Sequence, residues 1–129
     1  MALNILLIDD FEANALIFEY IADRLGFDMQ FAYKGAEGLE LAKKNKFDII
    51  LIDINLPDIS GSALALQLRR FAYDARLVAF TSEISTIKKE DMDNFDMVMQ
   101  KTFNEDEIRY FFKKLELQDK CTVAKTTIN

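Results

Sequence analysis

Five polar residues with complementary chemistry each follow the end of a short apolar run. They are Asp9, Asp10, Asp53, Thr81 and Lys101. An aspartate carboxylate can act as the nucleophile that forms an aspartyl-phosphate, and Mg²⁺ is commonly held by one or two carboxylates together with a substrate phosphate. A cation and an ammonium group would offset the charge on the phosphoryl oxygens, and a hydroxyl could bond one of them. If the five side chains meet, they are suited to phosphoryl transfer.

The segments between these residues alternate between short apolar runs typical of strands and amphipathic stretches typical of helices. Strands are predicted at residues 4–8, 29–33, 47–52, 76–81 and 97–100, and helices at 12–25, 36–45, 62–71, 85–93 and from 104 onward. The third run is apolar on both faces, as expected of a central parallel strand. The first helix is predicted from an apolar stripe and is closed by Gly26. That stripe consists of Ala13, Leu16, Ile17, Tyr20 and Ile21.

The last helix has the clearest pattern. Asn104 is a candidate N-cap, and Glu107 stands at the capping-box position three residues later. Its apolar side chains recur at helical spacing and predict a single buried face. They are Ile108, Phe111, Phe112 and Leu115.

Five βα units in strict alternation predict an α/β fold, with a parallel sheet, right-handed crossovers and helices on both faces. We expect a five-stranded, flavodoxin-like doubly wound sheet in the order 2-1-3-4-5, although periodicity alone leaves other doubly wound orders open. Ligands of such sheets bind at the carboxyl ends of the strands, near the switch point between strands 1 and 3. The five polar residues are therefore predicted to converge there from four strands. Three clustered carboxylates repel one another unless a cation neutralises them.

Composition limits the other possibilities. The chain has 129 residues and a net charge of −6, which argues against direct binding of nucleic acid. We expect one domain over residues 1–117 and a polar, disordered tail over 118–129. The absence of histidine excludes a Ser-His triad and a His-ligated metal, and the single Cys121 excludes a disulfide framework. No apolar run is long enough for a membrane span and no signal-peptide layout is present, so we expect a cytoplasmic protein.

Four motifs in order carry a resemblance to a known family. They are Asp9-Asp10, Asp53-Ile-Asn-Leu-Pro57-Asp-Ile-Ser-Gly61, Thr81-Ser-Glu83 and Lys101-Thr-Phe103. Over about residues 3–117 the sequence resembles the receiver domain of two-component response regulators. Each motif alone is weak, but four in order at the expected strand ends are a strong signal.

The resemblance implies a role for each residue. Asp53 would be the phosphoacceptor, Asp10 a direct ligand of Mg²⁺ (or Mn²⁺), and Asp9 a group acting through metal-bound water. The Asn55 carbonyl would supply a further ligand, while Thr81 and Lys101 would contact the phosphoryl group. Asn55 and Glu83 match family positions that tune phosphorylation and dephosphorylation rates. By contrast Asn14, early in the first predicted helix, has many structural explanations and is assigned no role.

Two residues depart from the family pattern. The family usually has a cis-proline after the lysine, whereas this chain has Thr102. Because a non-proline cis bond costs about 2.5–4 kcal/mol, we expect a trans peptide there and an altered placement of Lys101. The aromatic often found three residues before the lysine is replaced by Val98, which argues against a coupled threonine–aromatic rotation.

Three hypotheses follow. The first is a phosphorylatable switch that receives its phosphoryl group from a histidine kinase or a histidine phosphotransfer protein, since this chain has no histidine. It would catalyse its own phosphorylation and dephosphorylation, so calling it an enzyme is a matter of definition. Phosphorylation would bias the surface around helix 4, strand 5 and helix 5 toward a downstream protein that the sequence does not identify, and homodimerisation stays open.

The second hypothesis is a pseudo-receiver that only binds partners. The third, a hydrolase with an Asp nucleophile, is disfavoured because no cap domain is evident.

Overall fold

The computed structural model describes residues 3–71, 74–82, 84–102, 104–117 and 126–128. Its centre is a parallel sheet in the order β2-β1-β3-β4-β5-β6. The strands are β1 (Asn4–Ile8), β2 (Asp28–Ala32), β3 (Ile49–Asp53), β4 (Arg76–Thr81), β5 (Met97–Gln100) and β6 (Thr126–Ile128). The predicted order 2-1-3-4-5 is confirmed, with β6 added beside β5.

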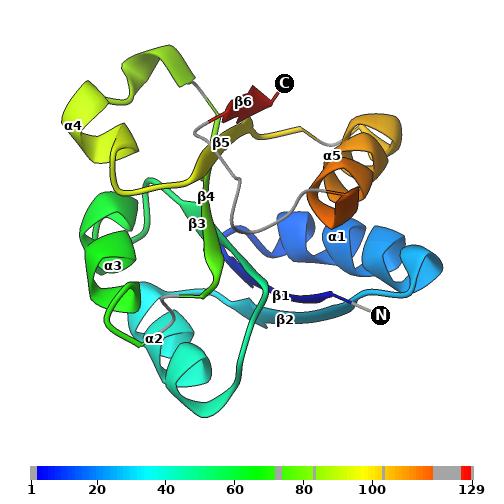
Figure 1. Ribbon diagram of the computed structural model, residues 1–129, viewed down its shortest axis with the longest axis horizontal. Coiled ribbons are helices and arrows are strands. Elements are labelled where there is room, and N and C mark those ends of the chain that lie inside the picture. Colours follow the sequence, from blue (N-terminus) through cyan, green and yellow to red (C-terminus); the bar gives the residue numbers. More distant parts are fainter. Residues whose placement is uncertain (1–2, 72–73, 83, 103, 118–125, 129) are drawn as a thin grey trace.

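Helices cover both faces of the sheet (Figure 1). One face carries α1 (Glu12–Leu25) and α5 (Glu105–Leu117), and the other carries α2 (Gly35–Lys44), α3 (Gly61–Leu68) and the short α4 (Lys89–Met92). Within the described part of the chain, no helix is both long enough and apolar enough to cross a membrane.

The central strands are buried on both faces, and their side chains divide between two hydrophobic clusters. Ile5 and Leu7 of β1 belong to the cluster beneath α1 and α5, whereas Leu6 and Ile8 belong to the cluster beneath α2 and α3. This division follows from the two-residue alternation of a strand. The four α5 side chains predicted to be buried lie in the first cluster with no exposed surface. Asn104 caps α5 as predicted, since its Oδ1 accepts the Glu107 N–H at 3.0 Å.

Helix α1 has the predicted bounds, but its apolar stripe and its buried face coincide only in part. Gly26 ends it in the left-handed conformation, with φ of 80°. Leu16 and Tyr20, which the stripe placed inward, are more than half exposed. The buried residues are Asn14, Ala15, Phe18, Ile21 and Ala22. The stripe is thus buried only in part: Ile21 has no exposed surface, but the buried face is shifted because it includes the polar Asn14.

The continuous helix predicted over residues 85–93 is wrong. The chain forms a 3₁₀ turn at Ile84–Thr86 and then α4, with Lys88 extended between them (φ −68°, ψ 146°). Three β-branched residues, Ile84, Thr86 and Ile87, lower the local helix propensity. Ile84, Ile87 and Met92 instead pack against the cluster beneath α2 and α3.

The tail prediction concerns residues that mostly lie outside the described part of the chain. Residues 118–125, including Cys121, and residue 129 are among these. Thr126–Ile128 form β6, which pairs in parallel with Met97–Met99 of β5. The backbone of these three residues thus extends the edge of the sheet.

The N-terminus of α2 is capped by a residue from a distant loop. Lys34, at the N-cap position, makes no side-chain cap bond. The carboxylate of Asp58 accepts the Gly35 N–H at 2.9 Å and the Ala36 N–H at 3.0 Å. These two bonds, that of Gly35 first, lower the pKa of Asp58 below its ordinary value. Asp58 thus ties the loop after β3 to α2.

Replacing Asp58 by alanine is expected to destabilise the fold by about 0.5–1 kcal/mol at neutral pH, the lower part of the range for helix caps because the carboxylate is exposed. Because the folded-state pKa is lowered, this stabilisation is present above the unfolded-state pKa and is lost as pH falls through the folded-state pKa. Urea unfolding of Asp58→Ala and the parent, at pH values on both sides of ordinary aspartate titration, measures the difference. Asp28→Ala, at an exposed acid on β2, is the control. An equal deficit at both pH values would contradict the assignment.

Candidate functional site

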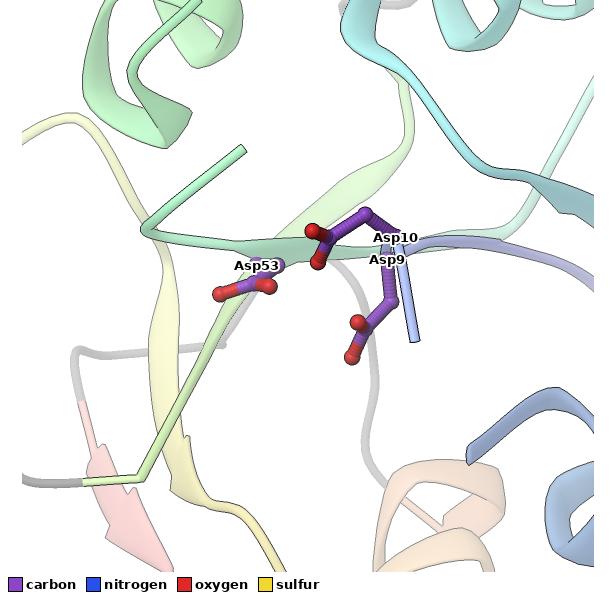
Figure 2. Close-up of side chains that lie close together, drawn as sticks. All are labelled: Asp9, Asp10 and Asp53. Atoms are coloured by element: carbon purple, nitrogen blue, oxygen red, sulfur yellow. The ribbon is translucent and has the colours of Figure 1, made fainter. Parts of the chain in front are cut away.

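Three carboxylates gather at the carboxyl ends of two neighbouring strands. Asp9 and Asp10 directly follow β1, and Asp53 ends β3 (Figure 2). One oxygen from each lies within 4.8 Å of the others. β1 and β3 are paired in parallel, which brings their carboxyl ends to the same edge of the sheet. The predicted convergence of these three acids is therefore observed.

Lys101 joins two of the acids. Its Nζ lies 3.1 Å from Asp53 Oδ2 and 3.2 Å from Asp9 Oδ2. The ammonium group also stands over the ring of Phe80, 5.5 Å from the ring centre. The residue is held in place through its backbone, since the Lys101 N–H donates to the Thr81 carbonyl at 2.6 Å. One cation thus bridges two carboxylates from different strands.

The adjacent acids Asp9 and Asp10 have different environments. Asp9 is only 2% exposed. Its Oδ1 accepts the Phe11 N–H at 2.9 Å, and its Oδ2 accepts from Asn14 Nδ2 at 2.7 Å and from Lys101. Asp10 is exposed, and no hydrogen bond or ion pair of its carboxylate occurs among the described residues. Asp10 is therefore the acid that is free to bind a cation directly.

Burial and charge act in opposite directions on Asp53. Desolvation raises the pKa of Asp53, and the Asn55 N–H bond and the Lys101 charge only partly offset it. The neighbouring Asp9 charge raises this pKa further. For Lys101, desolvation lowers the pKa but is outweighed by the charges of Asp53 and Asp9, so the net pKa is raised. Burial therefore dominates the shift of Asp53, whereas the two neighbouring carboxylates dominate the shift of Lys101.

The loop after Asp53 is held by hydrogen bonds and by a close approach of its backbone. Asp53 Oδ1 accepts the Asn55 N–H at 3.0 Å, and the Gly61 N–H donates to the Ile54 carbonyl at 2.9 Å. A Cβ on Gly61 would overlap the Asp53 carbonyl oxygen, so this close approach requires glycine. Ser60 then caps α3 by accepting the Ala63 N–H.

The remaining predicted residues are placed as follows. Thr81 is buried at the end of β4 and is joined to Lys101 through its carbonyl. No cis peptide occurs among the described residues, so the Lys101–Thr102 bond is trans as expected, and Lys101 nevertheless contacts Asp53. The Thr102 hydroxyl accepts the Asn104 N–H at the start of α5. Val98 is buried in the core. Glu83 and Phe103 lie outside the described residues.

This donor set suits a divalent cation that prefers oxygen ligands. Three carboxylates within 4.8 Å of one another supply such ligands, and carboxylates suit Mg²⁺, Ca²⁺ or Mn²⁺ better than softer metals. Burial is the main cause of the raised pKa of Asp53, and repulsion from the Asp9 carboxylate adds to it. A bound cation would relieve that repulsion, so the residues fit the metal.

The family comparison agrees with this geometry. Residues 5–113 match the model of the response regulator receiver domain. The chain is 31% identical over 131 residues to the aerobic respiration control sensor protein ArcB of Escherichia coli, covering 98% of this chain and 17% of ArcB. It is 34% identical to the cell cycle transcriptional regulator CtrA of Caulobacter vibrioides over 108 residues, covering 82% of this chain and 47% of CtrA. The chain thus spans less than half the length of these two relatives.

A solved structure shows the same fold. The response regulator protein TrrA of Thermotoga maritima, in complex with Mg²⁺ and BeF, superposes with a TM-score of 0.76 at 28% identity, covering 89% of this chain and 99% of TrrA. The fold and the acidic site define a receiver domain of two-component signalling. This chain belongs to the response regulator receiver domain family.

Proposed function

We propose that this receiver domain accepts a phosphoryl group on Asp53 in a reaction that requires Mg²⁺. The observation that carries the proposal is the close approach of Asp9, Asp10 and Asp53, with Lys101 bridging two of them. The complex of TrrA with Mg²⁺ and BeF supports the same chemistry in a relative. No observation in the described part of the chain favours a pseudo-receiver over this function.

The metal ligands are inferred from the family resemblance, and the carboxylate of Asp10, which is exposed and has no partner among the described residues, agrees with its role. Asp10 and Asp53 would bind Mg²⁺ directly, with the Asn55 carbonyl as a further ligand. Asp9 would act through metal-bound water, which fits its two oxygens already accepting hydrogen bonds. When bound, the ion supplies charge neutralisation and orients the phosphoryl group. Mn²⁺, which also takes oxygen ligands, is the alternative ion.

The residues of this chain would then divide the transfer step among them. A carboxylate oxygen of Asp53 forms the bond to phosphorus, and the bond from phosphorus to an imidazole nitrogen of the donor breaks. The electron pair of that bond stays on the imidazole. Lys101 and the Thr81 hydroxyl contact the phosphoryl oxygens, where negative charge must be offset. The same groups would assist the later hydrolysis.

The donor and the response are inferred from the family. A histidine kinase or a histidine phosphotransfer protein would supply the phosphoryl group, in the cytoplasm. Phosphorylation would shift the surface formed by α4, β5 and α5 toward binding a downstream protein. In this chain β6 lies beside β5 and would belong to that surface.

Intact-mass measurement after treatment with acetyl phosphate tests the proposal. The parent is expected to gain one phosphoryl mass increment with Mg²⁺ and none with EDTA. Asp53→Ala is expected to gain none under either condition, whereas the control Asp28→Ala should behave as the parent. Phosphorylation of Asp53→Ala to the parent level would refute Asp53 as the acceptor.

A parent that gains no mass is tested further with beryllofluoride, which stands in for the phosphoryl group. Mg²⁺-dependent binding of beryllofluoride, seen in amide chemical shifts around Asp53, would sustain the proposal despite a short-lived adduct. No binding would instead support the pseudo-receiver hypothesis.

A further inference from the structure

Asn14 is a buried polar residue that the proposed chemistry does not use. It lies in the first turn of α1 and is 1% exposed. Its Nδ2 donates to Asp9 Oδ2 at 2.7 Å, the shortest hydrogen bond that this carboxylate receives. Its Oδ1 is buried without a hydrogen-bond partner among the described residues. A buried, unpaired carbonyl oxygen is unfavourable, so fold stability alone does not explain an asparagine here.

The bond from Asn14 acts on the orientation of Asp9. The Phe11 N–H holds one oxygen of Asp9, and Asn14 with Lys101 holds the other. Lys101 also bonds Asp53, so its contact with Asp9 is shared. The amide of Asn14 makes no such second contact through Nδ2 among the described residues. Among the described residues, the side-chain N–H group of Asn14 therefore bonds only Asp9.

We propose that Asn14 is a positioning residue for the metal site, which fixes the Asp9 carboxylate in the orientation needed to bond metal-bound water. The inference rests on the proposed binding of Mg²⁺. Asn14 would not touch the ion; it would act only through Asp9. Partners that orient a residue in direct contact with a metal ion typically change metal affinity roughly 10–100-fold when they are removed. Because Asn14 would act through Asp9 and a water, we expect an effect at the lower end of that range.

The alternative is a purely structural role. Asn14 could simply provide a donor for a buried carboxylate near the N-terminus of α1, where Phe11 makes no side-chain cap bond. The two roles differ in one measurable respect. A positioning role changes Mg²⁺ affinity through Asp9, whereas a purely structural role changes thermal stability without Mg²⁺ and leaves the Mg²⁺ affinity of the folded variant unchanged.

A double-mutant cycle with Mg²⁺ alone as the probe separates these roles. The dissociation constant is measured by titrating Mg²⁺ into the full chain and following amide chemical shifts. The variants are Asn14→Leu, which resembles asparagine in shape and lacks the donor, Asp9→Ala, and both together. Thermal unfolding without Mg²⁺ reports the fold of each variant, and Asn14→Ala replaces Asn14→Leu if the larger side chain prevents folding.

We expect Asn14→Leu to raise the Mg²⁺ dissociation constant about tenfold in the parent background and less than about twofold when Asp9 is already alanine, as the cycle requires for coupled residues. The midpoint of thermal unfolding should not fall in parallel. An equal change in both backgrounds, or an unchanged dissociation constant in the parent background, would overturn the positioning role. Failure of the parent to bind Mg²⁺ would instead refute the proposed metal site itself, and the inference with it.

Discussion

Lys101→Met is expected to slow phosphorylation of Asp53 and, at the same time, to strengthen Mg²⁺ binding. In the structure Lys101 bridges Asp9 and Asp53 at 3.2 and 3.1 Å. During transfer its ammonium would bond the phosphoryl group, and loss of one such donor typically slows a reaction roughly 10²–10³-fold. Before transfer the same ammonium repels a cation at the acidic cluster. Removing a charge at this distance should raise Mg²⁺ affinity by about tenfold or more.

The same substitution should also lower the free energy of unfolding, because the carboxylates of the cluster would repel one another without the Lys101 ammonium. Without Mg²⁺, Asp9 and Asp53 would lose their shared cation, and we expect a loss of about 2 kcal/mol in the free energy of unfolding. Added Mg²⁺ should restore more stability to Lys101→Met than to the parent, because a ligand that binds the folded state more tightly stabilises it more.

Three measurements check this prediction. Intact mass follows the rate of phosphorylation by acetyl phosphate at saturating Mg²⁺, amide chemical shifts give Mg²⁺ affinity, and urea unfolding gives stability. Lys113→Met, at an exposed lysine of α5, is the matched control for loss of one positive charge. If Lys101→Met bound Mg²⁺ more weakly than the parent, the proposal that the Lys101 ammonium and Mg²⁺ compete for the acidic cluster would be refuted.

Asp10→Ala is expected to have the largest effect on metal binding. Asp10 is exposed beside two buried acids, and its carboxylate makes no hydrogen bond or ion pair with any described residue. As a direct ligand it should matter more than an orienting group, so we expect Mg²⁺ affinity to fall by more than roughly 100-fold. Fold stability without Mg²⁺ should be unchanged or slightly higher, because one of three mutually repelling charges is removed.

Mg²⁺ titration and thermal unfolding of Asp10→Ala test both parts of this expectation. Asp28→Ala is the control for the loss of an exposed acid outside the site. Asp9→Ala gives the contrast: we expect a smaller loss of Mg²⁺ affinity, since Asp9 would act through water, but a larger change in stability. The reverse ranking of the two acids would exchange their proposed roles.

The fold was largely predictable because its signals are local. A strand buried on both faces needs a continuous apolar run, as in residues 49–52, and parallel strands need helical crossovers between them. Caps are also local, and Asn104 was recognised from a spacing of three residues. On α1 the apolar stripe and the buried face coincide only in part. At residues 84–88, where β-branched residues interrupt the helix, the prediction was wrong.

The sequence by itself determined which chemical groups stand at the strand ends. Because parallel strands present their carboxyl ends at one edge, three acids, a threonine and a lysine were expected to meet there. Their types and order were sufficient to indicate phosphoryl transfer and the receiver family. No contact geometry was needed for that step.

Only the tertiary structure decided how these groups divide their work. Adjacent aspartates look alike in sequence, yet packing of α1 buries Asp9 beneath the Asn14 amide and leaves Asp10 exposed. Two further contacts join residues that are distant in sequence. Asp58 caps α2 by bonding Ala36, 22 positions earlier, and Lys101 bonds Asp53, 48 positions earlier. Such contacts depend on how whole elements pack against the sheet, and no period or spacing along the chain encodes them.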